Sequence, residues 1–99
     1  MKTIKNEKTS MVIAENEPPV DRLELLSIVL NQPLARGMNM SEMRQRIKIL
    51  DSIEASDKSE LKLEDSDFSY MKKTFEEFNW LVPHKDLIKF SDHLETINK

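Results

Sequence analysis

The chain contains no cysteine, only one glycine and no long apolar run, and each of these absences excludes a class of protein. Without cysteine, disulfide frameworks and thiolate metal sites are excluded. No stretch approaches the roughly 18 consecutive apolar residues that a membrane-spanning helix needs. One glycine is too few for a glycine-rich phosphate-binding loop. The 99 residues are therefore expected to form one domain without a membrane span.

Charge is unevenly distributed, although the formal net charge is only −3. The first nine residues hold three lysines and one glutamate, and residues 36–50 hold four basic residues and one acid. Residues 51–78 hold nine acids and four basic residues. Because nucleic-acid binding requires several phosphates to be neutralised together, the acidic total argues against a general nucleic-acid-binding protein.

Four segments repeat apolar residues at helical spacing. Helices are predicted over residues 23–31 and 41–55, on either side of Gly37. A third helix is expected to begin near Asp65, and Pro83 is expected at the first position of a fourth. The expected core is drawn from these helices: Leu26, Leu30, Ile47, Leu50, Phe68, Met71, Phe75, Phe78, Phe90 and Leu94.

A small β element is expected beside the helices. Residues 10–15 and 61–64 are short candidate strands, and each leaves its backbone groups unpaired without the other. Residues 1–9 are polar and lysine-rich and are interpreted as a flexible tail, so residues 10–99 form the single helical domain. The predicted fold is mainly α (α+β): a compact bundle of about four helices with a minor two-stranded β element.

Six methionines are many for this length, and Met38, Met40 and Met43 lie together at the start of the second predicted helix. Methionine adapts to irregular surfaces, so the cluster is interpreted either as a partner-binding surface or as a helix start packed into the core. Trp80 has two corresponding interpretations. It covers the end of the last two helices, or it anchors an interface.

Charged side chains supply further candidates for partner binding. Arg44 and Lys48 share a helix face, whereas Arg46 lies on another. With the lysine tail, this basic patch either contacts nucleic acid or forms a solvated or salt-bridging face. Four acids are candidates for docking on a host enzyme or nucleic-acid machine: Asp57, Glu60, Asp65 and Asp67.

The residues that carry chemistry do not form a complete motif. Asp65, Asp67 and Glu76 fall at positions 1, 3 and 12 of a calcium-binding loop, but the glycine required at position 6 is absent. His84 and His93 are nine residues apart and out of phase on a helix, so they are interpreted as boundary residues. We therefore expect no catalytic residue, no cofactor and no metal site, and a protein that is not an enzyme.

Five short segments carry a resemblance to known proteins: Asn31-Gln32-Pro33, Gly37-Met38, Met43-Arg44-Gln45-Arg46, Leu61-Lys62-Leu63-Glu64-Asp65 and Trp80. Together, over about residues 22–94, they resemble small accessory proteins encoded by tailed bacteriophages. The resemblance implies a virion component or a protein of the phage–host interaction.

Three functions are compatible with these features. The first is a non-enzymatic protein-interaction or assembly protein that binds copies of itself, as a homo-oligomer, or a larger partner. The second is a small inhibitor or regulator that docks on a host enzyme or nucleic-acid machine through its acidic face. The third is a DNA-binding protein that uses a basic helix face. No apolar run follows the charged first residues, so the predicted location is cytoplasmic, in the host cytoplasm or the virion if the protein is phage-encoded.

Overall fold

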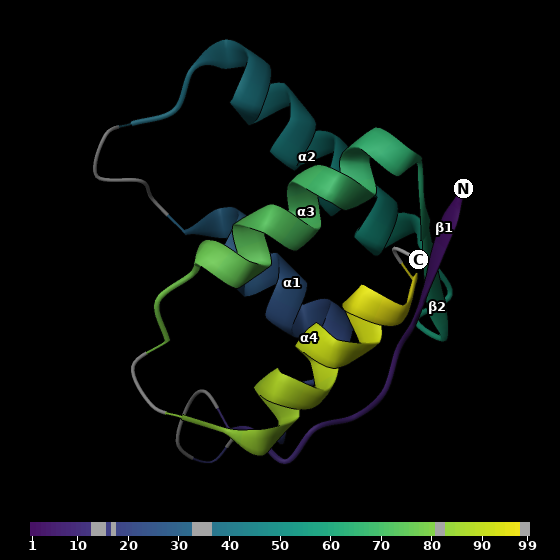
Figure 1. The fold of residues 1–99 in the computed structure, drawn as a ribbon, viewed down its shortest axis with the longest axis vertical. Helices are drawn as coiled ribbons and strands as arrows, with labels where there is room; N and C mark the ends of the chain where they lie inside the picture. The colour runs from purple at the N-terminus through teal and green to yellow at the C-terminus, as the bar shows by residue number, and fades with distance from the viewer. Residues whose placement is uncertain (13–15, 17, 33–36, 81–82, 98–99) are drawn as a thin grey trace.

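The computed structural model describes residues 1–12, 16, 18–32, 37–80 and 83–97. Within these residues, four helices and two strands follow one another along the chain (Figure 1): β1 (Lys2–Lys5), α1 (Arg22–Asn31), α2 (Met40–Ala55), β2 (Glu60–Leu63), α3 (Asp65–Glu77) and α4 (Lys85–Ile97). The Cα radius of gyration, 13.2 Å, is that of a compact domain of this length. The predicted four-helix bundle with a two-stranded β element is confirmed.

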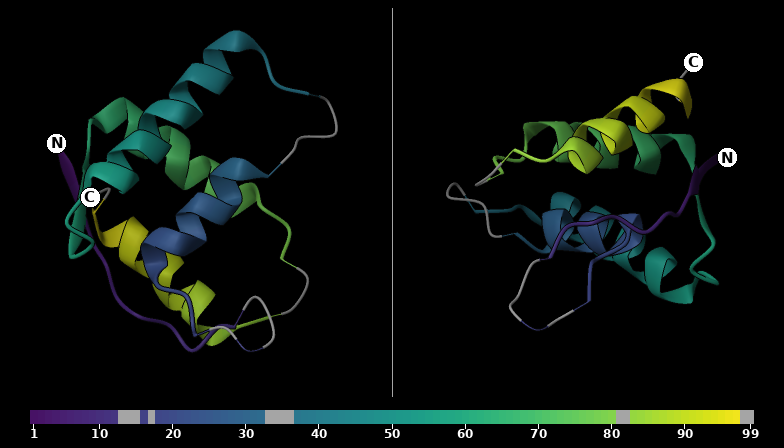
Figure 2. Two further views of the ribbon diagram at one scale, coloured as in Figure 1. Left: turned by 180° about the vertical axis from the view of Figure 1, so that it is seen from behind. Right: turned by 90° about the horizontal axis from the view of Figure 1, so that it is seen from below.

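The helices lie in two layers, as the right-hand view of Figure 2 shows. α1 and α2 form one layer, α3 and α4 form the other, and the two strands close one end. The apolar core lies where these elements meet. Its helical members are Leu23, Leu25, Leu26, Val29, Leu30, Ile49, Ile53, Phe68, Met71, Phe75, Leu87, Phe90 and Leu94.

Most of the predicted core is confirmed, but one helix is rotated relative to the prediction. Ile47 was expected to be buried and is 50% exposed. Helix α2 instead turns Arg46, Ile49 and Ile53 inward. The physical reason is that Arg46 donates hydrogen bonds to the end of α1, as described below. The predicted core residues Leu50 and Phe78 are only partly buried, at the edge of the core. 

The strand β2 pairs with a different segment from the one predicted. β1 pairs antiparallel with β2, and Ile4 lies opposite Leu61. Residues 1–9 are therefore not a flexible tail, because Ile4 is fully buried and anchors this segment. Of the candidate strand at residues 10–15, residues 10–12 are not a strand, and residues 13–15 lie outside the described part of the chain. β1 has one buried apolar residue in four, which leaves too little alternation for recognition from the sequence.

Side chains of residue types that favour N-caps begin the first two helices. Asp21 Oδ1 accepts from the backbone N–H of Glu24 at 2.9 Å, and Asn39 Oδ1 accepts from that of Glu42 at 2.8 Å. Gly37, two residues before the second cap, has a φ of +74°, in the left-handed region that glycine adopts without a Cβ clash. These local signals explain where both helices begin.

The last helix begins two residues later than predicted, at Lys85 rather than Pro83. His84 supplies the cap: its Nδ1 accepts from the backbone N–H of Asp86 at 3.1 Å, and its carbonyl accepts from that of Leu87 at 3.2 Å. An N-cap side chain accepts a hydrogen bond from a backbone N–H in the first turn of its helix, as His84 does here. The helix therefore begins after His84, and Pro83 precedes the cap instead of lying in the first turn.

Aromatic rings connect α3 to α4. The Phe75 and Phe90 ring centroids are 5.0 Å apart with their planes at 68°. Trp80 follows α3, and its ring lies 4.5 Å from that of Phe78 and 5.9 Å from that of Phe75. The indole therefore covers the end of α3, one of the two helices whose ends the first interpretation of Trp80 names.

Candidate functional site

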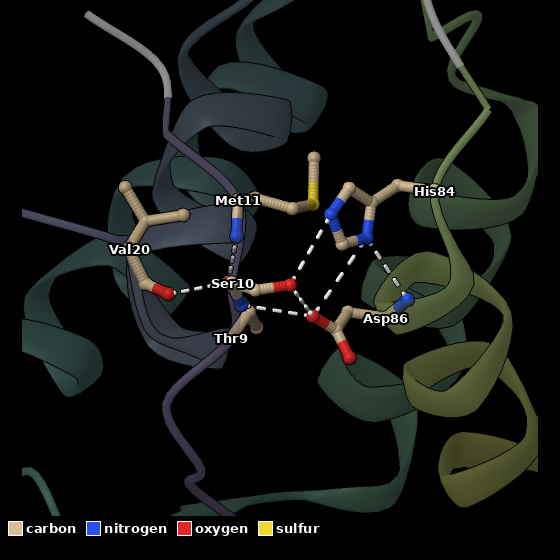
Figure 3. Close-up of polar contacts among 6 residues, drawn as sticks. All are labelled: Thr9, Ser10, Met11, Val20, His84 and Asp86. Atoms are coloured by element: carbon tan, nitrogen blue, oxygen red, sulfur yellow. Dashed lines mark hydrogen bonds and ion pairs between the residues drawn. The ribbon is translucent and has the colours of Figure 1, made fainter.

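Three polar side chains from distant parts of the chain meet at the start of α4 (Figure 3). Ser10 Oγ lies 3.4 Å from His84 Nε2 and donates a hydrogen bond to Asp86 Oδ2 at 2.9 Å. The Ser10 backbone N–H donates to the same oxygen at 2.9 Å. His84 Nδ1 is 3.7 Å from Asp86 Oδ2. A serine, a histidine and an aspartate are the residue types of a hydrolase triad, so the positions of their protons decide what they do.

The hydrogen bonds place these protons differently from those of a catalytic triad. Because the Asp86 N–H donates to His84 Nδ1, the proton of the neutral imidazole lies on Nε2, facing Ser10. The Ser10 hydroxyl in turn directs its own proton to Asp86. A nucleophilic serine needs an unprotonated Nε2 to take its proton. We therefore interpret Ser10, His84 and Asp86 as a structural clasp, called the Ser10 clasp below.

The Asp86 carboxylate is stabilised by the segment of chain around Ser10 that the clasp holds. Hydrogen bonds from the Ser10 backbone and hydroxyl hold the pKa of Asp86 below its ordinary value of 3.8, because they favour the carboxylate. Asp86 also lies in the first turn of α4, where the helix dipole favours a negative charge. Sequence reasoning treated His84 as a boundary residue and did not include Ser10, since 74 residues separate the two.

The segment that presents Ser10 is held on both sides. The Thr9 hydroxyl donates to the Val20 carbonyl and accepts from the Met11 backbone N–H, the latter at 3.2 Å. The Val20 backbone N–H donates to the Met11 carbonyl at 2.9 Å. Figure 3 shows the two hydrogen bonds of Thr9 beside the clasp. The segment is thus fastened both to the approach to α1 and to α4.

A second feature is an apolar stripe on the outer side of α2. Met40, Met43 and Ile47 occur at i, i+3 and i+7, and their exposed fractions are 62%, 37% and 50%. These three side chains are called the exposed α2 face below. Of the methionine cluster predicted from the sequence, Met38 is half-buried and lies before the helix. The cluster is therefore on the surface rather than packed into the core.

The predicted basic patch is divided by the rotation of α2. Arg46 is only 4% exposed, and its Nη1 donates to the carbonyls of Leu30 at 3.1 Å and Val29 at 3.4 Å. Its Nε donates to the Tyr70 hydroxyl at 2.9 Å. The last carbonyls of a helix have no partner within the helix, so Arg46 satisfies the end of α1. Arg44 stays exposed on the other side of α2.

Two of the predicted partner-binding residues bind one another. Lys48 Nζ lies 3.0 Å from Asp67 Oδ2 and 3.3 Å from Glu64 Oε2. Asp67 is only 5% exposed, and Gln45 Nε2 donates to its other oxygen at 3.4 Å. The bonds to Asp67 and then Glu64 raise the pKa of Lys48. Lys48 and Asp67 are therefore part of the contact between α2 and the start of α3.

The remaining acidic candidates are exposed but dispersed. Asp57 accepts from the Ser59 hydroxyl and backbone N–H, which lower its pKa, so it shapes the turn before β2. Glu60 begins β2 and lies 3.8 Å from the Lys62 ammonium. Asp65 is in the first turn of α3, where acids complement the helix dipole. Each of these acids has a local structural role.

The other histidine, His93, helps to hold the first strand. Its Nε2 accepts from the Lys5 backbone N–H at 3.3 Å. Burial, and then the charge of Arg22, lower the pKa of His93. Arg22 is itself buried beside β1: it pairs with Glu7 at 3.3 Å and lies 5.3 Å from the ring centroid of Phe90. These contacts give the first residues a fixed position.

A pocket of about 400 Å³ lies between α1, α2 and α3, and its lining includes Arg46, Tyr70, Lys73 and Glu77. The Nε and Nη1 atoms of the guanidinium on its wall already donate to the Tyr70 hydroxyl and to carbonyls, so these donors are directed into the protein. The pocket therefore does not present an unengaged arginine to a ligand.

The part of the chain that the structure describes holds neither a grouped set of metal ligands nor a helix of membrane-spanning character. No three histidine or acidic side chains there are grouped so that they could hold a metal ion. α3 is continuous from Asp65 to Glu77, so the acids of the calcium-loop pattern lie on a helix. None of the described helices is long and apolar enough to cross a bilayer.

Comparison with known proteins adds no relative. The chain matches no family model, no curated protein and no solved structure.

Proposed function

We propose that this protein is a non-enzymatic interaction protein and that it binds protein through the exposed α2 face. The observation that carries this proposal is the grouping of exposed apolar side chains. Among the described residues, six large apolar side chains are exposed, and Met40, Met43 and Ile47 follow one face of one helix. The others, Met1, Val12 and Ile88, belong to three separate segments.

An apolar helix face of this kind suits protein recognition. Single exposed apolar residues are ordinary, but a contiguous apolar patch on a folded surface marks an interaction site. An amphipathic helix binds a partner through side chains at i, i+3 and i+7, which is the spacing here. Two of the three are methionines, whose flexible thioethers adapt to a partner surface. 

The other functions considered from the sequence have weaker support. The Ser10 clasp directs the serine proton to Asp86, which does not favour nucleophilic catalysis. A DNA-binding helix face would need several basic residues, whereas Arg46 is buried and Lys48 is paired with acids. The acidic candidates for docking on a host enzyme bind residues of this chain or complete local turns.

The resemblance to accessory proteins of tailed phages supports the same class of function. Such proteins act in virions or in contacts with host proteins, and both roles depend on a protein-binding surface. We propose the virion or the host cytoplasm as the place where the exposed α2 face meets its partner.

Site-specific photocrosslinking tests this proposal. A benzoyl-phenylalanine placed at position 47 is expected to form adducts when the full chain is irradiated in its native host. The same amino acid at position 88 is the matched control, because Ile88 is an isoleucine of α4 that is 65% exposed but stands alone. Circular dichroism of both variants, expected to match that of the wild type, checks that they are folded.

The pattern of adducts decides between the outcomes. Protein adducts at position 47 and not at position 88 support the proposal, and their masses report the size of the partner. An absence of adducts at position 47, or equal yields at both positions, would contradict it, because the exposed α2 face would then not be a preferred contact.

A further inference from the structure

Helix α2 has an inward stripe that packs in the core and an outward apolar stripe that is mostly exposed among the described residues. The inward stripe consists of Arg46, Ile49 and Ile53. The outward stripe extends the exposed α2 face by one turn: Met40, Met43, Ile47 and Leu50. Its residues are alternately three and four positions apart, which is the a and d spacing of a coiled-coil seam. Leu50 is half-buried and joins the seam to the core at its edge.

Two opposite charges flank this seam on the same side. Arg44 and Asp51 are seven residues apart, so they occupy the same flanking position in successive heptads. Both are exposed, and within the described residues neither forms a side-chain hydrogen bond or an ion pair. Lys48, on the same helix, is by contrast paired with Asp67.

We infer that the occupant of the exposed α2 face is the α2 helix of a second copy of this chain, running antiparallel; this inference rests on the proposed function. A two-fold axis that crosses α2 at the level of Gln45 places Met40 opposite Leu50 and Met43 opposite Ile47 of the other copy. Because helical side chains lean toward the N-terminus of their own helix, Arg44 of each copy and Asp51 of the other then lean toward each other. Both pairs then lie on the same flank, because an antiparallel two-fold arrangement keeps each flank of the seam facing itself. Arg44 and Asp51, which lack side-chain partners among the described residues of one chain, thus pair with each other between two chains.

The opposite, parallel arrangement does not fit this helix. In a parallel pair, the flank that carries Arg44 meets the other flank of the second helix. On α2 that other flank holds Arg46 and Ile53, which are 4% and 6% exposed and belong to the core of their own chain. Arg44 would therefore meet no exposed acid in a parallel pair, and charge complementarity selects the antiparallel arrangement.

The dimer is expected to be weak. A seam of one helix buries less than the ~800 Å² per partner of a standard interface. Its dissociation constant is therefore expected in the range of roughly tens of micromolar. Sedimentation equilibrium of the full chain at low salt, up to about a millimolar, covers this range. 

Charge reversal on the flank tests the arrangement directly. Arg44→Asp and Asp51→Arg are each expected to weaken the homodimer about tenfold, because attraction at two exposed pairs becomes repulsion. An equimolar mixture of the two variants is expected to dimerise as the wild type does, since every cross-pair is then complementary. The double variant Arg44→Asp/Asp51→Arg is expected to recover the homodimer for the same reason.

Replacing one exposed isoleucine by glutamate on each of two helices tests whether the dimer forms through the exposed α2 face. Ile47→Glu is expected to abolish dimerisation, whereas Ile88→Glu on α4 is expected to leave it unchanged. All of these sites are exposed, so circular dichroism is expected to show the same helical content in each variant.

Several results would overturn the inference. These are a wild type that stays monomeric at a millimolar, a dimer that tolerates Ile47→Glu, and charge variants that do not recover when mixed. The proposed function fails separately, when position 47 forms no adduct at all. An adduct at position 47 with a different protein, together with a monomeric wild type, would leave the proposed function supported and reject the second copy.

Discussion

Replacement of Arg46 by methionine tests the rotation of α2, on which the exposed face depends. The Arg46 guanidinium makes its closest bonds with the Leu30 carbonyl at 3.1 Å and the Tyr70 hydroxyl at 2.9 Å. Two longer bonds reach the carbonyls of Val29 at 3.4 Å and Gln32 at 3.5 Å. Methionine keeps most of the apolar stem and removes every donor.

The expected loss of stability follows from these bonds. A hydrogen bond from a charged group contributes about 1.5–3 kcal/mol, and loss of the donor leaves the end of α1 without its partners. Because the two longer bonds add little, we expect Arg46→Met to lower the free energy of unfolding by about 3 kcal/mol. For a domain of this size, each kcal/mol lowers the Tm by about 4–8 °C, so the expected change is at least about 12 °C.

Urea and thermal unfolding measure this change against a neighbouring control. Arg44→Met replaces an exposed arginine on the same helix and is expected to change stability by no more than about 0.5 kcal/mol. Arg46→Lys is expected to be intermediate, because one ammonium cannot reach both the Tyr70 hydroxyl and the carbonyls of α1. If Arg46→Met and Arg44→Met unfold at the same urea concentration, Arg46 does not hold the end of α1 and the described rotation of α2 is wrong.

Three further outcomes follow from the other contacts. Ile4→Ala is expected to cost about 3 kcal/mol and to expose the first residues to proteases, because Ile4 is fully buried; resistance equal to that of the wild type would argue for a tail outside the fold. Asp86 has a lowered pKa in the folded state, so its contribution to stability is present above its unfolded pKa of 3.8 and is lost as the pH falls through the lower folded value. In urea titrations between pH 2 and 5, the free energy of unfolding of Ser10→Ala should therefore fall less steeply with pH than that of the wild type. The pKa of His93 is also lowered in the folded state, so the unfolded chain binds this proton more readily and the free energy of unfolding decreases as the pH falls below 6.5. His93→Gln should remove this slope between pH 5 and 7 in urea unfolding.

The candidate surface could be predicted only in part. Methionine content and spacing indicate Met40 and Met43 from the sequence, because these features depend on residue type and order alone. The pairing of Lys48 with Asp67 could not be predicted, because the two residues come from different helices whose relative placement sequence spacing does not report. The Ser10 clasp was missed for the same reason, since its members are far apart in the chain.

The sequence by itself determined the four helices, their first caps and most of the core. Helical hydrogen bonds connect residues four apart, and caps act within one turn, so apolar spacing and residues such as Asp21 and Asn39 carry this information locally. Tertiary structure decided which stripe of α2 turns inward, because the end of α1 needs donors and Arg46 can supply them. It also decided that β1, with Ile4 opposite Leu61, pairs with β2, since strand pairing joins segments that the sequence keeps apart.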